Sequence, residues 1–493
     1  MMKPGKFISI AVGMIISLPL MGEEMKITLQ EAIAIAKVQS VDAAVAINEL
    51  RSAYWQYRSF RADQLPEINL SASLPNYNRN YDTYQQEDGS YIYVRNNYLG
   101  MDGTLSIDQN IPFTGGKVSI NTSLDYLKQM DNRNGKLFMS IPFALTYSQP
   151  IMGTNRMKWE RKIQPVKYRE AQAKFASDME EITMRTINYY FNLLLAKENL
   201  NISRQNLANS RKLHEAAKAK RRMGQISEND LLQMELNVLD SQSELSGNGS
   251  SLHSAMFQLR SFLGLDSSVV IEPVIPHTFE CPPLSYEDVL QKALANNHFS
   301  QNILRRKLEA QYEVAAAKGD IRSITLFAQV GYTGTGEALR RAYSNLNNNQ
   351  VIQVGVKMPI LDWGKRRGRV KMAQSNQVVV ESRLKQESLN FNQNIFIVTE
   401  QFNNQMLLLQ NASLADTIAR KRYRTNVETF LAGKISTLDL NDSQTRKDRA
   451  RQKYLNEMFW WWYYYYQIRS ITLWDYINEA PIMMADFDKT LNL

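Results

Sequence analysis

Two hydrophobic periodicities alternate along this chain. Apolar residues spaced three and four positions apart, as in Phe175, Met179 and Ile182, predict amphipathic helices. Two such stretches, residues 166–223 and 369–432, contain no glycine or proline. At 1.5 Å per residue, each predicts a helix of roughly 85 to 95 Å. This length favours helices that pack lengthwise on other helices over a helix in the core of a large soluble domain.

Alternation of apolar and polar residues predicts β-strands between these helices. In the first half, a second pair of alternating segments flanks the turn Thr114-Gly115-Gly116 and predicts an additional hairpin. Residues 76–99 and 334–349 are rich in Asn, Tyr, Gly and Ser, so we expect exposed turns there. The alternating segments are residues 68–74, 105–113, 118–124, 143–147, 326–332 and 352–358.

Two landmarks of the chain recur at one offset. Pro150 begins Pro-Ile-Met-Gly-Thr-Asn-Arg, and 209 positions later Pro359 begins Pro-Ile-Leu-Asp-Trp-Gly-Lys. At the same offset, Gly-Gln-Ile-Ser at 224–227 is matched by Gly-Lys-Ile-Ser at 433–436. Two matches at one spacing predict a tandem duplication.

The offset is larger near the start of the repeats. Residues 28–32 match residues 285–289 at 257 positions, so the first copy carries about 48 additional residues. The predicted organisation is a signal peptide (1–22), a first repeat (23–264, strands at about 66–150, long helix 166–223), a linker (265–284), a second repeat (285–480, strands at about 324–358, long helix 369–432) and a C-terminal tail (481–493).

The N-terminus predicts export. Lys3 and Lys6 precede an apolar run over residues 7–20, which is typical of a secretory signal peptide. Beyond it no run of about 20 apolar residues occurs, which excludes a helical inner-membrane protein. The single cysteine, Cys281, excludes an intramolecular disulfide. The net charge of +9 is spread along the helices, and nucleic acid is a poor partner for an exported protein.

Strands with one apolar face must form a closed sheet in a membrane, because open edges leave backbone groups unsatisfied. The sequence predicts four to six strands per chain, fewer than the eight of the smallest membrane barrels. Several chains would therefore pool their strands.

The signal peptide, the duplication and the order of helices and strands together resemble the TolC family of outer-membrane efflux proteins, over residues 25–480. The motifs are the Leu65-Pro66 step into a strand, the Gln149-Pro150-Ile151 step out of one, and the two Gly-x-Ile-Ser turns. The resemblance implies a mixed, mainly α fold: a homotrimer whose long helices form a periplasmic α-barrel continuous with a 12-stranded outer-membrane β-barrel.

The same resemblance implies a function and partners. The chain would be the passive exit duct of a tripartite efflux pump for small molecules, in the outer membrane of a Gram-negative bacterium and extending into the periplasm. Its partners would be outer-membrane lipid, a periplasmic adaptor (membrane fusion) protein and, through the adaptor, an inner-membrane transporter. The residues expected to dock the adaptor are Gly224, Gln225, Ile226 and Ser227 at one helix tip and Gly433, Lys434, Ile435 and Ser436 at the other.

Three acidic residues near the tips are candidates for the pore entrance. Asp439 and Asp442 lie on one helix face, and the resemblance implies that they form acidic rings at a pore constriction. In a trimer such crowding would raise their pKa values. Asp230 matches a family position that helps to hold the gate closed. Its usual partners, an aromatic hydroxyl and an arginine, are replaced here by Phe430 and Ile435, so we expect Arg221, Arg222 or Lys434 to act instead, or a looser gate.

Other functions remain open at this stage. A type I protein secretion duct has the same sequence features, and a periplasmic coiled-coil scaffold without a pore would share the long helices. An enzyme has the least support, because no nucleophile, base or metal-ligand constellation occurs and no cofactor is indicated. The aromatic run at residues 459–466 favours packing between helices over ligand binding.

Overall fold

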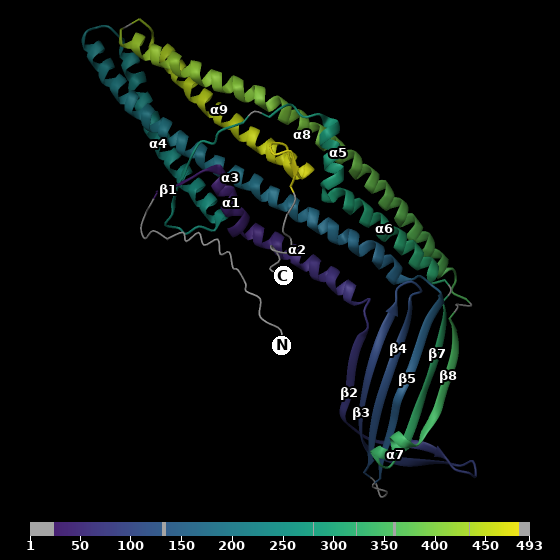
Figure 1. Cartoon of the computed structure of the whole chain (residues 1–493). Coiled ribbons are helices and arrows are strands. Elements are labelled where there is room, and N and C mark those ends of the chain that lie inside the picture. The colour runs from purple at the N-terminus through teal and green to yellow at the C-terminus, as the bar shows by residue number, and fades with distance from the viewer. Residues whose placement is uncertain are drawn as a thin grey trace, which may run out of the picture. The chain divides into compact units, whose positions relative to one another are not determined.

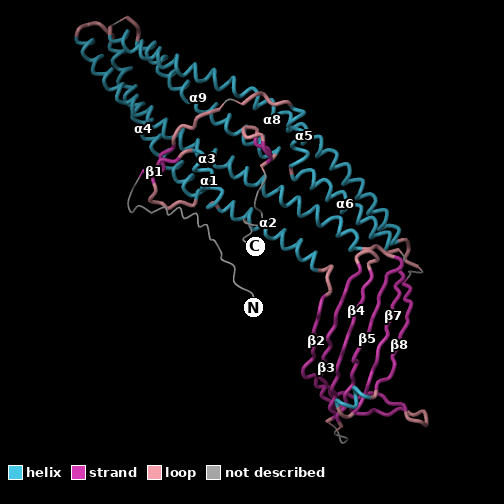
Figure 2. The backbone as a smooth tube through the Cα atoms, in the orientation of Figure 1, coloured by secondary structure: helices cyan, strands magenta, loops and turns pink. Residues whose placement is uncertain are grey.

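The computed structural model describes residues 24–482 except 131–134, 280, 322, 358–360 and 433. The predicted signal peptide, Pro359, Gly433 and most of the predicted tail lie outside the described residues. The chain consists mainly of long helices together with six long antiparallel strands (Figures 1 and 2).

The helices of the two halves have matching lengths. Each half contains, in order, helices of 11, 22, 67 and 36 residues. The first two pairs begin 257 positions apart and the last two begin 209 apart, which confirms the tandem duplication. The helices are α1 (Leu29–Gln39), α2 (Val41–Ala62), α3 (Arg156–Arg222) and α4 (Glu228–Leu263), matched by α5 (Tyr286–Asn296), α6 (His298–Gly319), α8 (Lys365–Leu431) and α9 (Thr437–Thr472).

Both long helices begin earlier than the sequence predicts. The expected start at residue 166 followed from Pro165, yet Pro165 lies inside α3. Proline removes one backbone hydrogen bond from a helix interior. Ile163 and Val166 on either side are buried, so packing of this face offsets that loss. In α8 the expected start at 369 followed from Gly368, which also lies inside the helix.

The chain divides into two compact units that do not coincide with the repeats. The first unit contains residues up to 48, 175–296 and those from 393 onward, and the second contains 49–174 and 297–392. Each unit therefore takes segments from both repeats. The long helices α3 and α8 belong to both, because a helix of 67 residues extends beyond any single core.

Aromatic residues form much of the core of the first unit. Trp461 and Tyr465 of α9 are almost fully buried, and their rings stack with an interplanar angle of 5°. Phe279 packs edge-on against both rings. The run at 459–466 thus packs between elements, as its composition predicts. Beside this core, β1 (Glu24–Ile27) pairs in parallel with β6 (Val270–Pro273).

A buried ion-pair network joins α1, α3 and α9 in this unit. The Glu180 carboxylate accepts hydrogen bonds from Lys37 Nζ at 2.9 Å and from Arg469 Nε at 3.1 Å. Arg469 also pairs with Asp475 at 2.8 Å, next to the short antiparallel pair β9 (Trp474–Asp475) and β10 (Ala480–Pro481). Burial opposes the charge of Arg469 and is the largest single effect, but Glu180, Tyr465 and Tyr466 together outweigh it and raise the guanidinium pKa.

The second unit contains one six-stranded antiparallel sheet in the order β2-β3-β4-β5-β7-β8. The 48 additional residues of the first repeat supply β3 and β4, which lie between β2 and β5. The short helix α7 (Leu339–Ser344) connects β7 to β8. The strands are β2 (Glu67–Gln85), β3 (Tyr91–Ile111), β4 (Gly116–Gln129), β5 (Lys136–Met152), β7 (Ser323–Gly336) and β8 (Leu346–Lys357).

The loops expected at 76–99 and 334–349 are wrong in large part. Residues 76–85 and 91–99 continue β2 and β3 as a paired ribbon, so only residues 86–90 make the turn. Alternating asparagine and tyrosine side chains suit an exposed strand pair as well as a loop. Within residues 334–349, the helix α7 packs closely on β7, since a Cβ at Gly334 would lie 1.9 Å from the Ala342 carbonyl oxygen.

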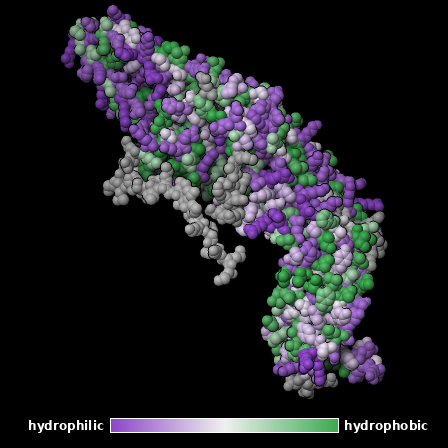
Figure 3. All heavy atoms as spheres, viewed as in Figure 1, coloured by the Kyte–Doolittle hydropathy of each residue, from purple (hydrophilic) through white to green (hydrophobic). Residues whose placement is uncertain are grey.

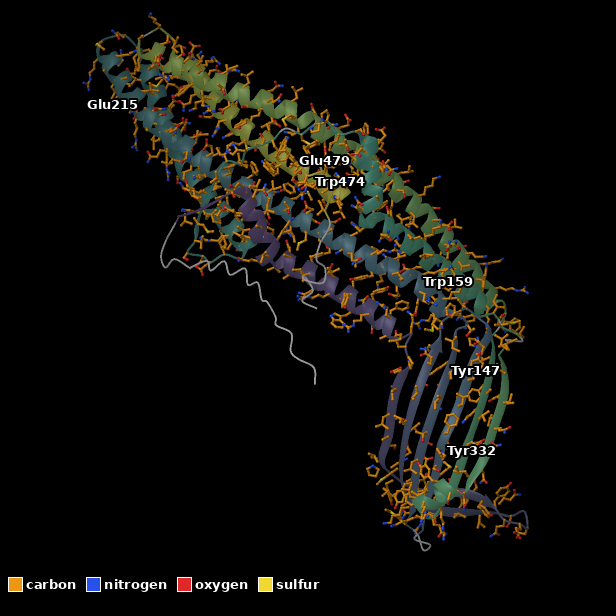
Figure 4. All side chains as sticks on the ribbon, in the orientation of Figure 1. Tyr147, Trp159, Glu215, Tyr332, Trp474 and Glu479 are labelled. Atoms are coloured by element: carbon orange, nitrogen blue, oxygen red, sulfur yellow. The ribbon has the colours of Figure 1, made fainter. Side chains whose placement is uncertain are left out.

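The sheet has one apolar and one polar face. One row of register partners across the strands is apolar in its first five members, and the next row is mostly polar. Figure 3 shows hydrophobic side chains over the strands, and Tyr147 and Tyr332 lie on the sheet (Figure 4). The first row is Ile68, Ile107, Ile120, Leu145, Val330 and Gln350; the second is Glu67, Asp108, Ser119, Thr146, Gln329 and Val351.

Candidate gate at the helix tips

One backbone hydrogen bond is common to the two helix tips. Gly224 has a φ of 71°, in the left-handed region that glycine adopts without strain. Gln225 N then donates to Lys220 O at 2.9 Å, and in the second tip Lys434 N donates to Thr429 O at 3.1 Å. The matching sequences therefore close two equivalent turns, one between α3 and α4 and one between α8 and α9 (Figure 1).

A serine and an aspartate cap the helix that follows each turn. Asp230 Oδ2 accepts hydrogen bonds from Ser227 N at 3.1 Å and from Ser227 Oγ at 2.7 Å. Asp439 Oδ2 accepts the same two bonds from Ser436, at 3.3 Å and 2.6 Å. The bonds from Ser227 lower the pKa of Asp230. Both aspartates thus have a structural role in the chain, in addition to the pore and gate roles expected from sequence.

Asp442 is paired with two arginines. Its carboxylate accepts hydrogen bonds from Arg446 Nε at 2.9 Å and 3.0 Å, and from an Arg422 nitrogen of α8 at 3.0 Å. These contacts with Arg446 and Arg422 hold the pKa of Asp442 below its ordinary value. Within one chain, the effect on this carboxyl is opposite in sign to the crowding expected for an acidic ring.

Direct hydrogen bonds join the first tip to the second. Lys220 Nζ donates to Phe430 O at 2.8 Å and lies 4.8 Å from the centre of the Phe430 ring. Thr437 Oγ1 donates to Asp230 Oδ1 at 3.3 Å. Farther along, Asn237 Nδ2 donates to Asn441 Oδ1 at 3.1 Å. Asp230 does link the tips, but through Thr437.

Lys220 and Thr437 are the tip contacts that sequence reasoning missed. Phe430 lacks a hydroxyl, yet its backbone carbonyl oxygen accepts the bond from Lys220, and its ring face lies against the same ammonium group. Any residue would supply the carbonyl, and any aromatic residue would supply the ring face. Of the three basic residues expected to hold the gate, Arg221 instead pairs with Glu228 of its own hairpin at 3.4 Å. Lys220 lies next to Arg221 in a run of basic residues, so only the direction of its side chain distinguishes it.

A small apolar cluster lies beneath these polar contacts. Ile226 and Ile435, one from each tip, pack against the same buried residues, so the second of these positions supports the tip by packing without a charge. Lys220 closes over the cluster through the Phe430 ring. The buried members are Leu213, Ala217, Met234, Tyr423, Phe430 and Leu440.

Comparison with known proteins identifies the family. Residues 32–265 match the family described as outer membrane efflux protein. The chain belongs to this family, which includes TolC. The fold agrees with that of the outer-membrane channel OprN, at 13% identity and a TM-score of 0.65 over 90% of this chain and 89% of that one. No curated protein sequence matches the chain.

Two further channels share the fold. CmeC of Campylobacter jejuni has 14% identity and a TM-score of 0.66, covering 94% of this chain and 88% of its own. The open state of MtrE from Neisseria gonorrhoeae has 13% identity and a TM-score of 0.58, covering 90% and 88%. The TM-scores support the shared architecture, and the family supplies the class of activity: outer-membrane efflux rather than enzymatic catalysis.

Two features of the described residues bear on other classes of protein. None of the helices there is both long enough and apolar enough to cross a membrane. No three histidine, cysteine, aspartate or glutamate side chains of the same residues are arranged as ligands of a metal ion.

Proposed function

We propose that this chain is the outer-membrane exit duct of a tripartite efflux pump and acts as a homotrimer. The family match supports the efflux function, and the six-stranded sheet supports the membrane assignment. A row of apolar side chains crosses that sheet on one face, whereas aspartate, serine and threonine cross it on the other. Lipid on one side and water on the other would satisfy both faces.

The two tips are the proposed docking site for a periplasmic adaptor, through which an inner-membrane transporter is reached. Gln225, Ser227, Lys434 and Ser436 are exposed, while Ile226 and Ile435 anchor each turn to the cluster below. Gly224 and Gly433 belong to the same turns by sequence. Apolar side chains are exposed beside both tips, which suits a protein partner: Met223 is 63% exposed and Leu438 is 77% exposed.

The contacts between the tips are the proposed gate of the duct. Lys220 and Asp230 hold the tips together within a chain, and Asp439 and Asp442 would line the constriction where three copies meet. Opening then requires the loss of a few polar contacts and the movement of a small apolar cluster. An adaptor that binds separated tips more tightly than closed ones would supply the free energy for this change.

The sheet argues against a periplasmic scaffold without a pore. Apolar residues of its outermost strands are largely exposed in the chain, Leu70 at 76% and Ile352 at 78%. A water-soluble scaffold would not leave a continuous apolar sheet face in water. A type I secretion duct would use the same architecture, and the family's description as an efflux protein favours small-molecule export.

Single-channel recording in a planar lipid bilayer tests the duct and its gate together. The purified protein should give small, cation-selective steps, and Lys220→Met should raise the open probability or conductance severalfold by removing the bond to Phe430 O. Lys218→Met is the matched control, since Lys218 pairs with Glu215 on its own helix at 2.9 Å. Absence of conductance from well-folded protein would contradict the duct, and equal conductance of all three would contradict the gate.

A further inference from the structure

The two edges of the six-stranded sheet need partners. β2 pairs with β3 alone and β8 pairs with β7 alone among the described strands. Leu70 on β2 and Ile352 on β8 carry the apolar face out to both edges. In hydrocarbon, each unpaired backbone group at such an edge costs several kcal/mol, so neither edge is stable against lipid. A second copy of the same chain offers the complementary edge.

Strand direction allows the edges to join copy to copy. β2 follows helix α2 and β8 precedes helix α8, so the two strands run in opposite directions relative to the helices. β8 of one copy beside β2 of the next therefore continues the antiparallel pattern. Any number of copies can be added in this way until the sheet closes, as a membrane barrel requires.

The two additional strands belong to the wall of that sheet. β3 and β4 lie between β2 and β5, and they pair with each other continuously from Tyr98–Gln129 to Ile111–Gly116. Each of them also pairs with a neighbour on its other side, β3 with β2 and β4 with β5, so the hairpin has no free edge in this sheet. Their side chains also follow the pattern of the rest, with Ile107 and Ile120 in the apolar row and Asp108 and Ser119 in the polar row.

The polar row on these strands is built as a wall facing water. Asp108 of β3 accepts hydrogen bonds from Ser119 Oγ of β4 at 2.5 Å and from Asn69 Nδ2 of β2 at 3.4 Å. Lys117 Nζ lies 3.2 Å from the same carboxylate. This network connects three adjacent strands on one face, which is the face that a water-filled channel would expose.

From this placement we propose that three copies join edge to edge into an outer-membrane barrel of eighteen strands. This rests on the homotrimer proposed above and departs from the twelve strands that the family resemblance implies. Four strands from each of three chains give twelve, whereas this chain contributes six in one continuous sheet. Because barrel diameter grows roughly linearly with strand number, the barrel is about 1.5-fold wider and its cross-section about 2.3-fold larger.

The two barrel sizes predict separations that can be measured. Strands about 4.8 Å apart and tilted by about 40° occupy about 6.3 Å of circumference each. The backbone radius is then about 18 Å for eighteen strands and about 12 Å for twelve. Equivalent backbone positions in the three copies are therefore about 31 Å apart in the larger barrel and about 21 Å apart in the smaller one. A label that projects about 7 Å from the backbone into the lumen shortens these separations to about 19 Å and about 9 Å.

Dipolar electron paramagnetic resonance between nitroxide labels on the intact trimer measures this separation. Thr104→Cys in β3 and Thr146→Cys in β5 each place one label per chain on the polar face, in a Cys281→Ser background. Labels on two different strands keep the test valid if one of the two variants fails to fold. Gln225→Cys, at an exposed helix tip of the other unit, is the control for trimer formation.

A separation between labels of about 19 Å at both strand positions would establish the larger barrel. A separation between labels of about 9 Å, with a single distance at Gln225, would leave the homotrimer in place and overturn the eighteen strands. No coupling between labels at any of the three positions would overturn the homotrimer itself.

Discussion

Asp442 shows how single ion pairs set the charge at the tips. Because Arg446 and Arg422 lower its pKa, the carboxylate keeps these contacts at every pH above the ordinary aspartate value of about 4. The stabilisation is lost only as the pH falls through the lower, folded-state value. We therefore expect the conductance and cation selectivity of the channel to change little between pH 5 and pH 8.

Bilayer recordings across this range check the expectation. A raised pKa would instead give a titration step between pH 5 and pH 8, with selectivity rising as the carboxylates ionise. Such a step, present in the native protein and absent from Asp442→Asn, would mean that crowding in the trimer outweighs the two arginines.

Lys220 is a second single residue on which the proposed gate depends. In the same basic run, Lys218 pairs with Glu215 and Arg221 pairs with Glu228. The bond to Phe430 O depends on one side chain, that of Lys220, which crosses from α3 to α8. The gate is therefore sensitive to one lysine, although the composition of the run would suggest that its members are interchangeable.

At the scale of the element, the two tips are duplicate helix caps. Ser227→Ala and Ser436→Ala each remove the side-chain bond to the third residue of the following helix, at a cost of about 1 kcal/mol. We expect the first-turn amides of α4 and α9 to exchange hydrogen about five-fold faster, measured by native-state hydrogen exchange. Ser243→Ala, on an exposed stretch of α4, is the control and should change nothing in either turn.

Equal effects at the two tips are the expected signature of the duplication. Faster exchange confined to one tip would show that the other is held by contacts apart from its cap. Thr437 and Asp230 are the contacts that would then deserve mutation, because they connect one cap to the other.

The aromatic run of α9 gives an element-scale prediction about packing. Trp461 is 0% exposed and Trp460 is 41% exposed, although they are adjacent in sequence. Trp461→Ala should lower the free energy of unfolding of the first unit by about 3 to 5 kcal/mol, and Trp460→Ala by less than about 1 kcal/mol. Denaturant unfolding followed by circular dichroism of the helices compares them. Equal losses would mean that the run faces a common partner instead of the core.

At the scale of the whole molecule, the sheet edges should meet between copies. Leu70→Cys in β2, combined with one cysteine in β8 and with Cys281→Ser, should form disulfides between chains. Cross-linking should alternate along β8, since side chains on the apolar face of both strands approach each other and those on the polar face do not. The expected cross-linking positions are Asn348, Gln350 and Ile352, and the matched controls are Asn347, Asn349 and Val351.

Denaturing electrophoresis without reductant reads this pattern as bands of two and three chains. Cross-linking at all six β8 positions would show only that the strands collide in solution. Cross-linking at none, in protein that remains trimeric, would mean that another strand forms the contact between copies.

Local patterns predicted most of the elements because their causes are local. The three-and-four spacing around Phe175 and the absence of glycine from 166–223 predict the long helix, and period-two alternation predicts all six strands. The helix starts were missed at Pro165 and Gly368, two residues that lie inside the helices. At Pro165, burial of Ile163 and Val166 outweighs the unfavourable propensity. The ribbon at 76–99 was missed because asparagine and tyrosine suit both loops and paired edge strands.

The duplication, the family and the two tip turns can all be read from the amino-acid sequence, since repeated motifs and helix-capping residues act over a few positions. The position of β3 and β4 inside the sheet follows from the three-dimensional fold alone, because strand order depends on pairing between distant segments. The fold also decides that Lys220 reaches Phe430 and that Asp442 pairs with Arg422. These contacts join residues 20 or more positions apart, and only the packing of one helix on another sets their distances.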